Sequence, residues 1–84
     1  MPARIVVTEF VSLDGVMEAP GSHRLVQELI EADLVDQVNL MVFPVILGAG
    51  KKVFDEQPER RDLRLTDSKV VGEGIAVLIY ERAA

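Results

Sequence analysis

The sequence contains no cysteine and no tryptophan, and it has only one histidine among its 84 residues. Without cysteine the chain can form neither a disulfide-stapled scaffold nor a zinc site with cysteine ligands, and this composition fits a reducing compartment. The single histidine, His23, falls in the first turn of an expected helix. We interpret it as a surface residue, because no neighbouring residues complete a metal-binding set.

The sequence also lacks a long apolar run and an excess of positive charge. No stretch approaches the roughly 18–20 apolar residues that a membrane-spanning helix needs, and the residues after Met1 do not resemble a signal peptide. The net charge of −5 makes the chain a poor candidate for binding nucleic acid or an anionic membrane surface. We therefore expect a soluble cytoplasmic protein with no nucleic-acid or membrane partner.

What the sequence does contain is apolar residues, which make up 49% of the chain. That share is too high for a disordered segment. The length allows one small domain, residues 1–84, which buries only about 60% of the surface that its unfolded chain exposes. Such a domain is marginally stable as a monomer.

The apolar pattern predicts an α/β domain with the order β-α-β-β-β. Strands are expected at Ile5–Val11, Val38–Phe43, Leu63–Val71 and Ile75–Tyr80, and a helix at Ser22–Asp33. "KKVFDE", from Lys51 to Glu56, is expected to form one helical turn, and "GEG", Gly72 to Gly74, a tight turn. The first three elements form a right-handed crossover with parallel strands. The result is a four-stranded mixed sheet with one main helix.

Three of these strands carry apolar residues on both faces, whereas one helix covers only one face of a sheet. In the third strand, Leu63 and Leu65 are expected to face inward, with Arg64 and Thr66 outward. Another molecule must therefore cover the second face or pair with an open edge. A second copy of the chain is the simplest source.

Three loop segments are expected to meet at the carboxyl edge of the sheet, where open α/β sheets bind ligands. They are "SLDG" (Ser12 to Gly15), "GS" (Gly21 and Ser22) at the start of the helix, and "PVILGAGK" (Pro44 to Lys51). Asp14 either hydrogen-bonds a polar substrate or simply forms a turn with Gly15. Gly21 and Ser22 either bind a phosphate through free amides or simply cap the helix.

"LGAGKK" is not a phosphate-binding loop of the Walker type. That pattern requires glycine at position 45 and serine or threonine at position 52, where this chain has Val45 and Lys52. The glycines instead predict a tight turn and a close approach of the backbone to a ligand or a neighbouring segment. No nucleophile–base–acid set is visible, so the sequence names no catalytic residue.

Taken together, the segments resemble a known family. "IVVTEFVSLDGVMEAPG", "GSHRLVQELIEADLVDQVNLMVFPVILGAGKKVF" and "LRLTDSKVVGEGIAVLIYE" resemble the two ends of dihydrofolate-reductase-like proteins related to the C-terminal reductase domain of bacterial riboflavin biosynthesis. In that family a long middle portion, with much of the NADPH adenosine site, separates "SLDG" from "GS". Here Gly21 follows Pro20 directly, so the chain resembles a single truncated reductase-like domain. Asp33 replaces the glycine usual before "LVD".

The resemblance implies a role for each matching loop. Ser12, Asp14 and Gly15 would line the substrate and nicotinamide region, Gly21 and Ser22 would face the cofactor pyrophosphate, and the nicotinamide side of the cleft would be formed by Gly48, Ala49 and Gly50. The function implied is that of an NADPH-dependent reductase acting on a pterin- or pyrimidine-like substrate, with catalysis impaired or absent in this short form. The alternative is a non-catalytic oligomeric remnant or interaction module.

The shortened sheet carries an expectation about partners as well. Losing the middle portion exposes the strand at residues 5–11 as a new edge, which is apolar and free of proline. We expect a homodimer that forms through this edge and through the uncovered face of the sheet.

Overall fold

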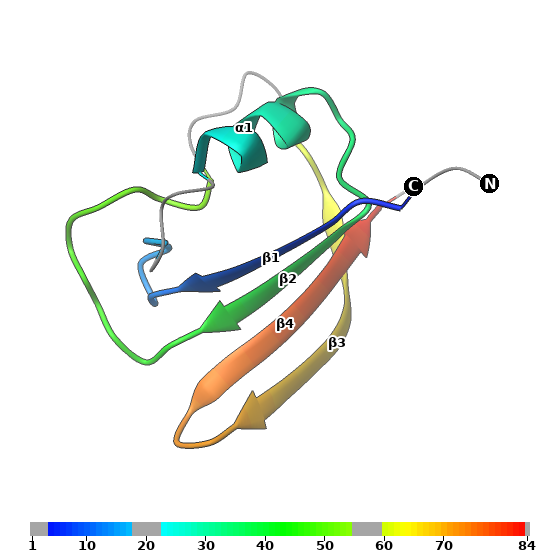
Figure 1. Cartoon of the computed structure of the whole chain (residues 1–84). Coiled ribbons are helices and arrows are strands. Elements are labelled where there is room, and N and C mark those ends of the chain that lie inside the picture. Colours follow the sequence, from blue (N-terminus) through cyan, green and yellow to red (C-terminus); the bar gives the residue numbers. More distant parts are fainter. Residues whose placement is uncertain (1–3, 18–22, 55–59, 84) are drawn as a thin grey trace.

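The computed structural model describes residues 4–17, 23–54 and 60–83, which form one four-stranded sheet with one helix. The elements are β1 (Val6–Val11), α1 (His23–Glu31), β2 (Gln37–Val42), β3 (Leu63–Val71) and β4 (Ile75–Arg82). The sheet order is β1-β2-β4-β3, with β1 parallel to β2 and the other two pairings antiparallel. The predicted β-α-β-β-β order and mixed sheet are confirmed (Figure 1).

The helix lies over one face of the sheet (Figure 1) and forms the first part of the core. Alternate residues of a strand point to opposite faces, so Val7 points toward α1 while Val6 points away and stays exposed. Val26 and Ile30, one helical turn apart, are buried against Val7. This small apolar contact attaches the crossover helix to β1.

A second apolar cluster lies where β1 and β2 end. It joins Val11 to Met17 and Val53, with Leu40 and Val42 packed against it. Val53 comes from the long segment between β2 and β3. The chain therefore completes its core with a loop residue that is more than 40 positions distant from β1 along the sequence.

The segment around Val53 is not helical: Lys52 lies in an isolated bridge and Val53 and Phe54 form a bend, so the expected turn of helix is wrong for its described part. Lys52 forms an isolated antiparallel bridge with Val16. The buried Gln27 side chain of α1 donates a hydrogen bond from Nε2 to the Val53 carbonyl, at 2.6 Å. These long-range contacts fix the backbone in a shape that its local sequence does not indicate. The last two expected residues of that turn, Asp55 and Glu56, lie outside the described residues.

The hairpin of β3 and β4 is largely uncovered. Gly72 and Gly74 have positive φ angles of 56° and 102°, which confirms the predicted turn. Every residue of β3 is exposed and none of β4 is buried, although β4 lies between β2 and β3. The expected inward positions Leu63 and Leu65 are 43% and 49% exposed. The helix therefore covers only the β1–β2 half of the sheet.

Within the described residues, no helix is long and apolar enough to cross a membrane.

Candidate functional site

Two loops meet at the carboxyl ends of β1 and β2, where the sequence placed the candidate site. Backbone hydrogen bonds join them directly. The Leu13 amide donates to the Val45 carbonyl at 2.8 Å, and the Met17 amide donates to the Lys51 carbonyl at 2.7 Å. The residues after β1 and those after β2 therefore form one connected structure.

The Asp14 carboxylate closes this connection. It accepts a hydrogen bond from the Ser12 hydroxyl, and it accepts the Leu47 and Gly48 amides at 3.2 and 2.9 Å. The Ser12 hydroxyl lowers the pKa of Asp14 most, and the amide of Gly48 contributes next, so that the pKa falls from 3.8 to about 2. Asp14 is therefore a carboxylate at neutral pH and holds the two loops together.

Ser12 supports the same structure from inside. Its side chain is buried. The hydroxyl oxygen accepts a hydrogen bond from the Val16 amide at 3.0 Å, and the hydroxyl group donates a hydrogen bond to Asp14. Ser12 is thus engaged within the protein. Gly15, the third predicted substrate-lining residue, has φ 81° and open space around its α-carbon. The geometry gives Ser12 and Asp14 a structural role, and contact of this loop with a substrate stays a prediction.

The glycines of the second loop have different reasons to be glycine. Gly48 has φ 79°, and a Cβ there would meet nothing within 4 Å. Gly50 has φ 126°, and a Cβ there would lie 2.7 Å from Cγ1 of the buried Val16. Gly50 is therefore required by close packing of the two loops, whereas the space beside Gly48 is open and Ala49 is exposed.

NADPH, the cofactor that the resemblance implies, contains a pyrophosphate that needs binding partners. A pyrophosphate is bound by free backbone amides or by cationic side chains, but Asp14 already occupies the amides of Leu47 and Gly48. Gly21 and Ser22, the predicted pyrophosphate residues, lie outside the described residues. Among the residues described, no group of three histidine, aspartate or glutamate side chains could hold a metal ion.

The two joined loops carry exposed apolar side chains, which the sequence analysis did not predict. We call Leu13, Val45, Ile46 and Leu47 the apolar collar. Leu13 is 63% exposed and Ile46 is 73% exposed. The run "VIL" was visible in the sequence, but only the hydrogen bonds of Asp14 show that the backbone holds it at the surface. The collar offers an exposed apolar surface on which a flat ring could stack.

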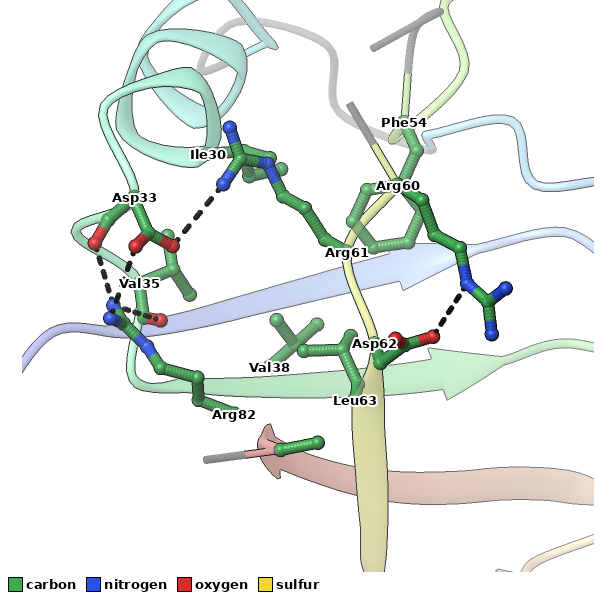
Figure 2. A pocket seen from close by; sticks show the side chains of 11 residues that line it. Ile30, Asp33, Val35, Val38, Phe54, Arg60, Arg61, Asp62, Leu63 and Arg82 are labelled. Atoms are coloured by element: carbon green, nitrogen blue, oxygen red, sulfur yellow. Dashed lines mark hydrogen bonds and ion pairs between the residues drawn. The ribbon is translucent and has the colours of Figure 1, made fainter. Parts of the chain in front are cut away.

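A separate hollow of about 560 Å³ lies at the other end of the sheet, beside the end of α1 (Figure 2). Its apolar lining includes Ile30, Val35 and Val38, and three arginines also line it, of which Arg61 and Arg82 reach Asp33 (Figure 2). The strand pairing explains this position. Leu63 pairs with Arg82, and Gln37 at the start of β2 pairs with Glu81, so the start of β3, the end of β4 and the start of β2 lie together.

Arg61 and Arg82 bind the backbone and side chain of residues at the C-terminal end of α1. Asp33 has φ 58°, the left-handed conformation that usually selects glycine at this position. Arg61 donates to the Glu31 carbonyl at 3.3 Å and pairs with the Asp33 carboxylate, while Arg82 donates to the Asp33 carbonyl at 2.6 Å. Cations at a helix C-terminus stabilise it. These contacts give a physical reason for aspartate at position 33.

Comparison with known proteins agrees with this architecture. The sequence model of the RibD C-terminal domain matches residues 20–77. Two uncharacterized proteins of Bacillus subtilis (strain 168) are similar: YyaP is 30% identical over 60 residues, and YwjB is 35% identical over 63 residues. These matches cover 71% and 75% of this chain but 32% and 36% of the relatives. The chain thus spans about a third of the length of the curated relatives it matches.

A solved structure shows the same arrangement in three dimensions. The crystal structure of a "Putative riboflavin biosynthesis protein" from Shewanella sp. PV-4 superposes with a TM-score of 0.71 and 26% identity. The match covers 74% of this chain and 35% of that protein. The family match begins at Pro20, the residue that Gly21 follows directly where the relatives that the sequence resembles have a long middle portion. With more than half of its residues matched, this chain belongs to the RibD C-terminal domain family.

Proposed function

We propose that this chain is a reductase-type domain that retains the substrate and nicotinamide side of a cofactor cleft and does not transfer hydride by itself. The observation that carries this proposal is the Asp14 carboxylate, which joins the loops after β1 and β2 through Ser12, Leu47 and Gly48. The joined loops hold their shape through their own hydrogen bonds, so a partial site persists without the remainder of a full-length relative.

The proposed ligand surface is the apolar collar beside Gly48 and Ala49. A nicotinamide ring, or a pterin- or pyrimidine-like ring, has flat apolar faces, and the exposed side chains of Leu13, Ile46 and Leu47 suit such faces. The cofactor is NADPH by family resemblance. When bound, NADPH would supply the hydride, and the chain's own part would be to orient the ring against the loops.

Two features argue against independent catalysis. Reduction of an unsaturated ring needs a proton as well as a hydride, and Asp14, with its pKa lowered to about 2, carries no proton to give at neutral pH. The chain also spans about a third of its relatives, and the amides of Leu47 and Gly48 are occupied. Binding energy for the rest of NADPH would have to come from elsewhere.

Isothermal titration with NADPH tests the proposal, with nicotinamide mononucleotide as a probe of the nicotinamide end alone. We expect saturable binding of both, lost in Asp14→Ala because the two loops separate. Lys69→Ala, on the exposed outer strand, is the matched control that keeps full binding. Absence of saturable binding to the unmodified chain would overturn the retained half-site. NADPH oxidation above background with dihydrofolate or a pyrimidine substrate would overturn the absence of catalysis.

A second candidate function is a non-catalytic interaction module. It is favoured by β4, a strand of the sheet interior in which six consecutive apolar residues, Ile75 to Tyr80, remain only half-buried. An uncovered apolar surface of this kind is more typical of a contact with a partner than of a ligand site. Unchanged association in the presence of saturating NADPH, together with no cofactor binding, would favour this candidate over the first.

A further inference from the structure

The hollow beside the end of α1 leaves part of its apolar lining in contact with solvent. Ile30 and Val38 form the buried part of this lining, whereas Phe54 and Leu63 are 39% and 43% exposed. The volume of about 560 Å³ lies within the roughly 300–1000 Å³ that small-molecule sites occupy. A ligand that covers Phe54 and Leu63 therefore gains free energy from the removal of apolar surface from water.

The three arginines of the lining differ in how completely their N–H groups are bound, and Arg82 has the most acceptors. It donates to the Asp33 and Val35 carbonyls at 2.6 and 3.1 Å. The carboxylates of Asp33 and Asp36 also lie near its guanidinium group, at 3.4 and 3.9 Å. Protein acceptors therefore compensate most of the charge of Arg82.

Arg60 and Arg61 keep donors that no described residue accepts. A guanidinium group has five N–H donors. Arg60 bonds to the Asp62 carboxylate through Nε at 2.9 Å, and neither of its Nη groups has an acceptor among the described residues. Arg61 uses both Nη groups, on Asp33 and on the Glu31 carbonyl, but its Nε is buried and has no acceptor in the described part of the chain. This side of the hollow therefore carries positive charge that the described residues compensate only in part.

We propose that the hollow binds a small monocarboxylic acid with an apolar body. The apolar body would cover Phe54 and Leu63, and the carboxylate would accept hydrogen bonds from the Nη groups of Arg60 (Figure 2). A carboxylate matches the fork of a guanidinium group with two parallel hydrogen bonds. The hollow and Asp14 lie at opposite ends of the sheet, so this site does not overlap the apolar collar.

The charges around the hollow select this class of ligand. A cation would meet three guanidinium groups. A dianion such as a phosphate monoester would be repelled by the carboxylates of Asp33 and Asp62, which also line the hollow. An uncharged apolar molecule would gain nothing from the donors of Arg60. A single carboxylate gains charge-assisted hydrogen bonds and brings only one negative charge near the two aspartates.

Titration of the ¹⁵N-labelled chain with octanoate, followed by amide chemical shifts in NMR spectra, tests the proposal. We expect saturable shifts that are confined to the end of α1 and the starts of β2 and β3, near Ile30, Val38 and Leu63. Octan-1-ol has the same chain length without the charge. It should bind at least about tenfold more weakly, because it forms no charge-assisted hydrogen bonds. Octyl phosphate, the dianionic probe, should also bind more weakly than octanoate.

Two matched pairs of variants locate the site. Arg60→Gln should weaken octanoate binding by about two- to fivefold and leave octan-1-ol binding unchanged, because Arg60 is exposed and Arg61 remains. Arg64→Gln removes the same charge from the exposed strand β3 outside the lining and should change neither. Leu63→Trp should fill the hollow and weaken both ligands at least about tenfold. Leu65→Trp, on the same face of β3 but outside the lining, should not.

The same spectra show whether each variant is folded, and they separate this site from other apolar surfaces. Absence of saturable octanoate binding, or shifts spread over the apolar collar or along β4, would overturn the proposal. Equal affinities for octanoate and octan-1-ol, tighter binding of octyl phosphate, or equal effects of Arg60→Gln and Arg64→Gln would also overturn it. None of these probes is a nicotinamide, so this site and the proposed half-site succeed or fail separately.

Discussion

The contact between Gly50 and Val16 gives the sharpest test of why the second loop contains its glycines. In Gly50→Ala the new methyl group meets two obstacles: a φ of 126°, which residues with a side chain rarely adopt, and Val16 Cγ1 at 2.7 Å. Val16 is buried and its β-branched side chain is stiff, so it cannot move aside cheaply. Gly48→Ala meets only the first kind of obstacle, at φ 79° with open space around it.

The expected magnitudes follow from these differences. Backbone strain at Gly50 costs about 1–3 kcal/mol, and overpacking against Val16 costs a further ~1–3 kcal/mol. Alanine returns about 0.5–1 kcal/mol by restricting the unfolded chain. Gly50→Ala should therefore lower the free energy of unfolding by about 2–4 kcal/mol. Gly48→Ala should lower it by about 1 kcal/mol or less.

Urea denaturation followed by circular dichroism measures both variants at one protein concentration. For a slope of about 1 kcal/mol/M, the midpoint should fall by about 2–4 M in Gly50→Ala and by about 1 M or less in Gly48→Ala. The double variant Val16→Ala/Gly50→Ala removes the clash and keeps the backbone strain. It should be at least about 1 kcal/mol more stable than the sum of the single effects predicts. Equal losses in the two glycine variants, or strict additivity, would refute the packing explanation.

Two further predictions concern Asp33 and Asp14. Asp33→Ala keeps the positive φ and loses the pairing with Arg61 and Arg82, so its free energy of unfolding in urea should fall by about 1–2 kcal/mol. Asp33→Gly loses the same pairing but relieves the backbone, so its free energy of unfolding should stay within about 0.5 kcal/mol of the natural chain. Equal losses in both variants would contradict this role of Asp33. Because the pKa of folded Asp14 is depressed to about 2, its stabilising contribution is present above the unfolded pKa near 4 and is lost as pH falls toward 2. The stability difference between the natural chain and Asp14→Asn, measured by thermal melts, should thus be constant above about pH 5 and shrink between pH 4 and 2. A difference that does not change with pH would contradict the role of Asp14.

The sequence alone predicts the sheet well because each strand is encoded locally. The apolar runs of β1, β2 and β4 and the glycines at positions 72 and 74 place these elements within two residues of their observed ends. Lys52 and Val53 show where local reading fails. Their non-helical shape depends on Val16, on Met17 and on the Gln27 side chain, which are remote in the sequence.

The sequence predicted that the loops after β1 and β2 would meet, but not how they are joined. That the loops after β1 and β2 would lie together follows from parallel strands, whose carboxyl ends share one edge of the sheet. That the Asp14 carboxylate would accept the amides of Leu47 and Gly48 requires the three-dimensional path of both loops. In the same way, the sequence shows only that aspartate replaces glycine at position 33. The ion pairs of Asp33 with Arg61 and Arg82 become visible only in the folded structure.

The expectation that a second copy of this chain covers the sheet is tested most directly by sedimentation equilibrium of the unmodified chain, with and without NADPH. We predict twice the chain mass of 9.3 kDa under both conditions, because the uncovered face of β3 and β4 exists whether or not the cofactor is present. A mass of 9.3 kDa at high protein concentration in both samples would contradict it.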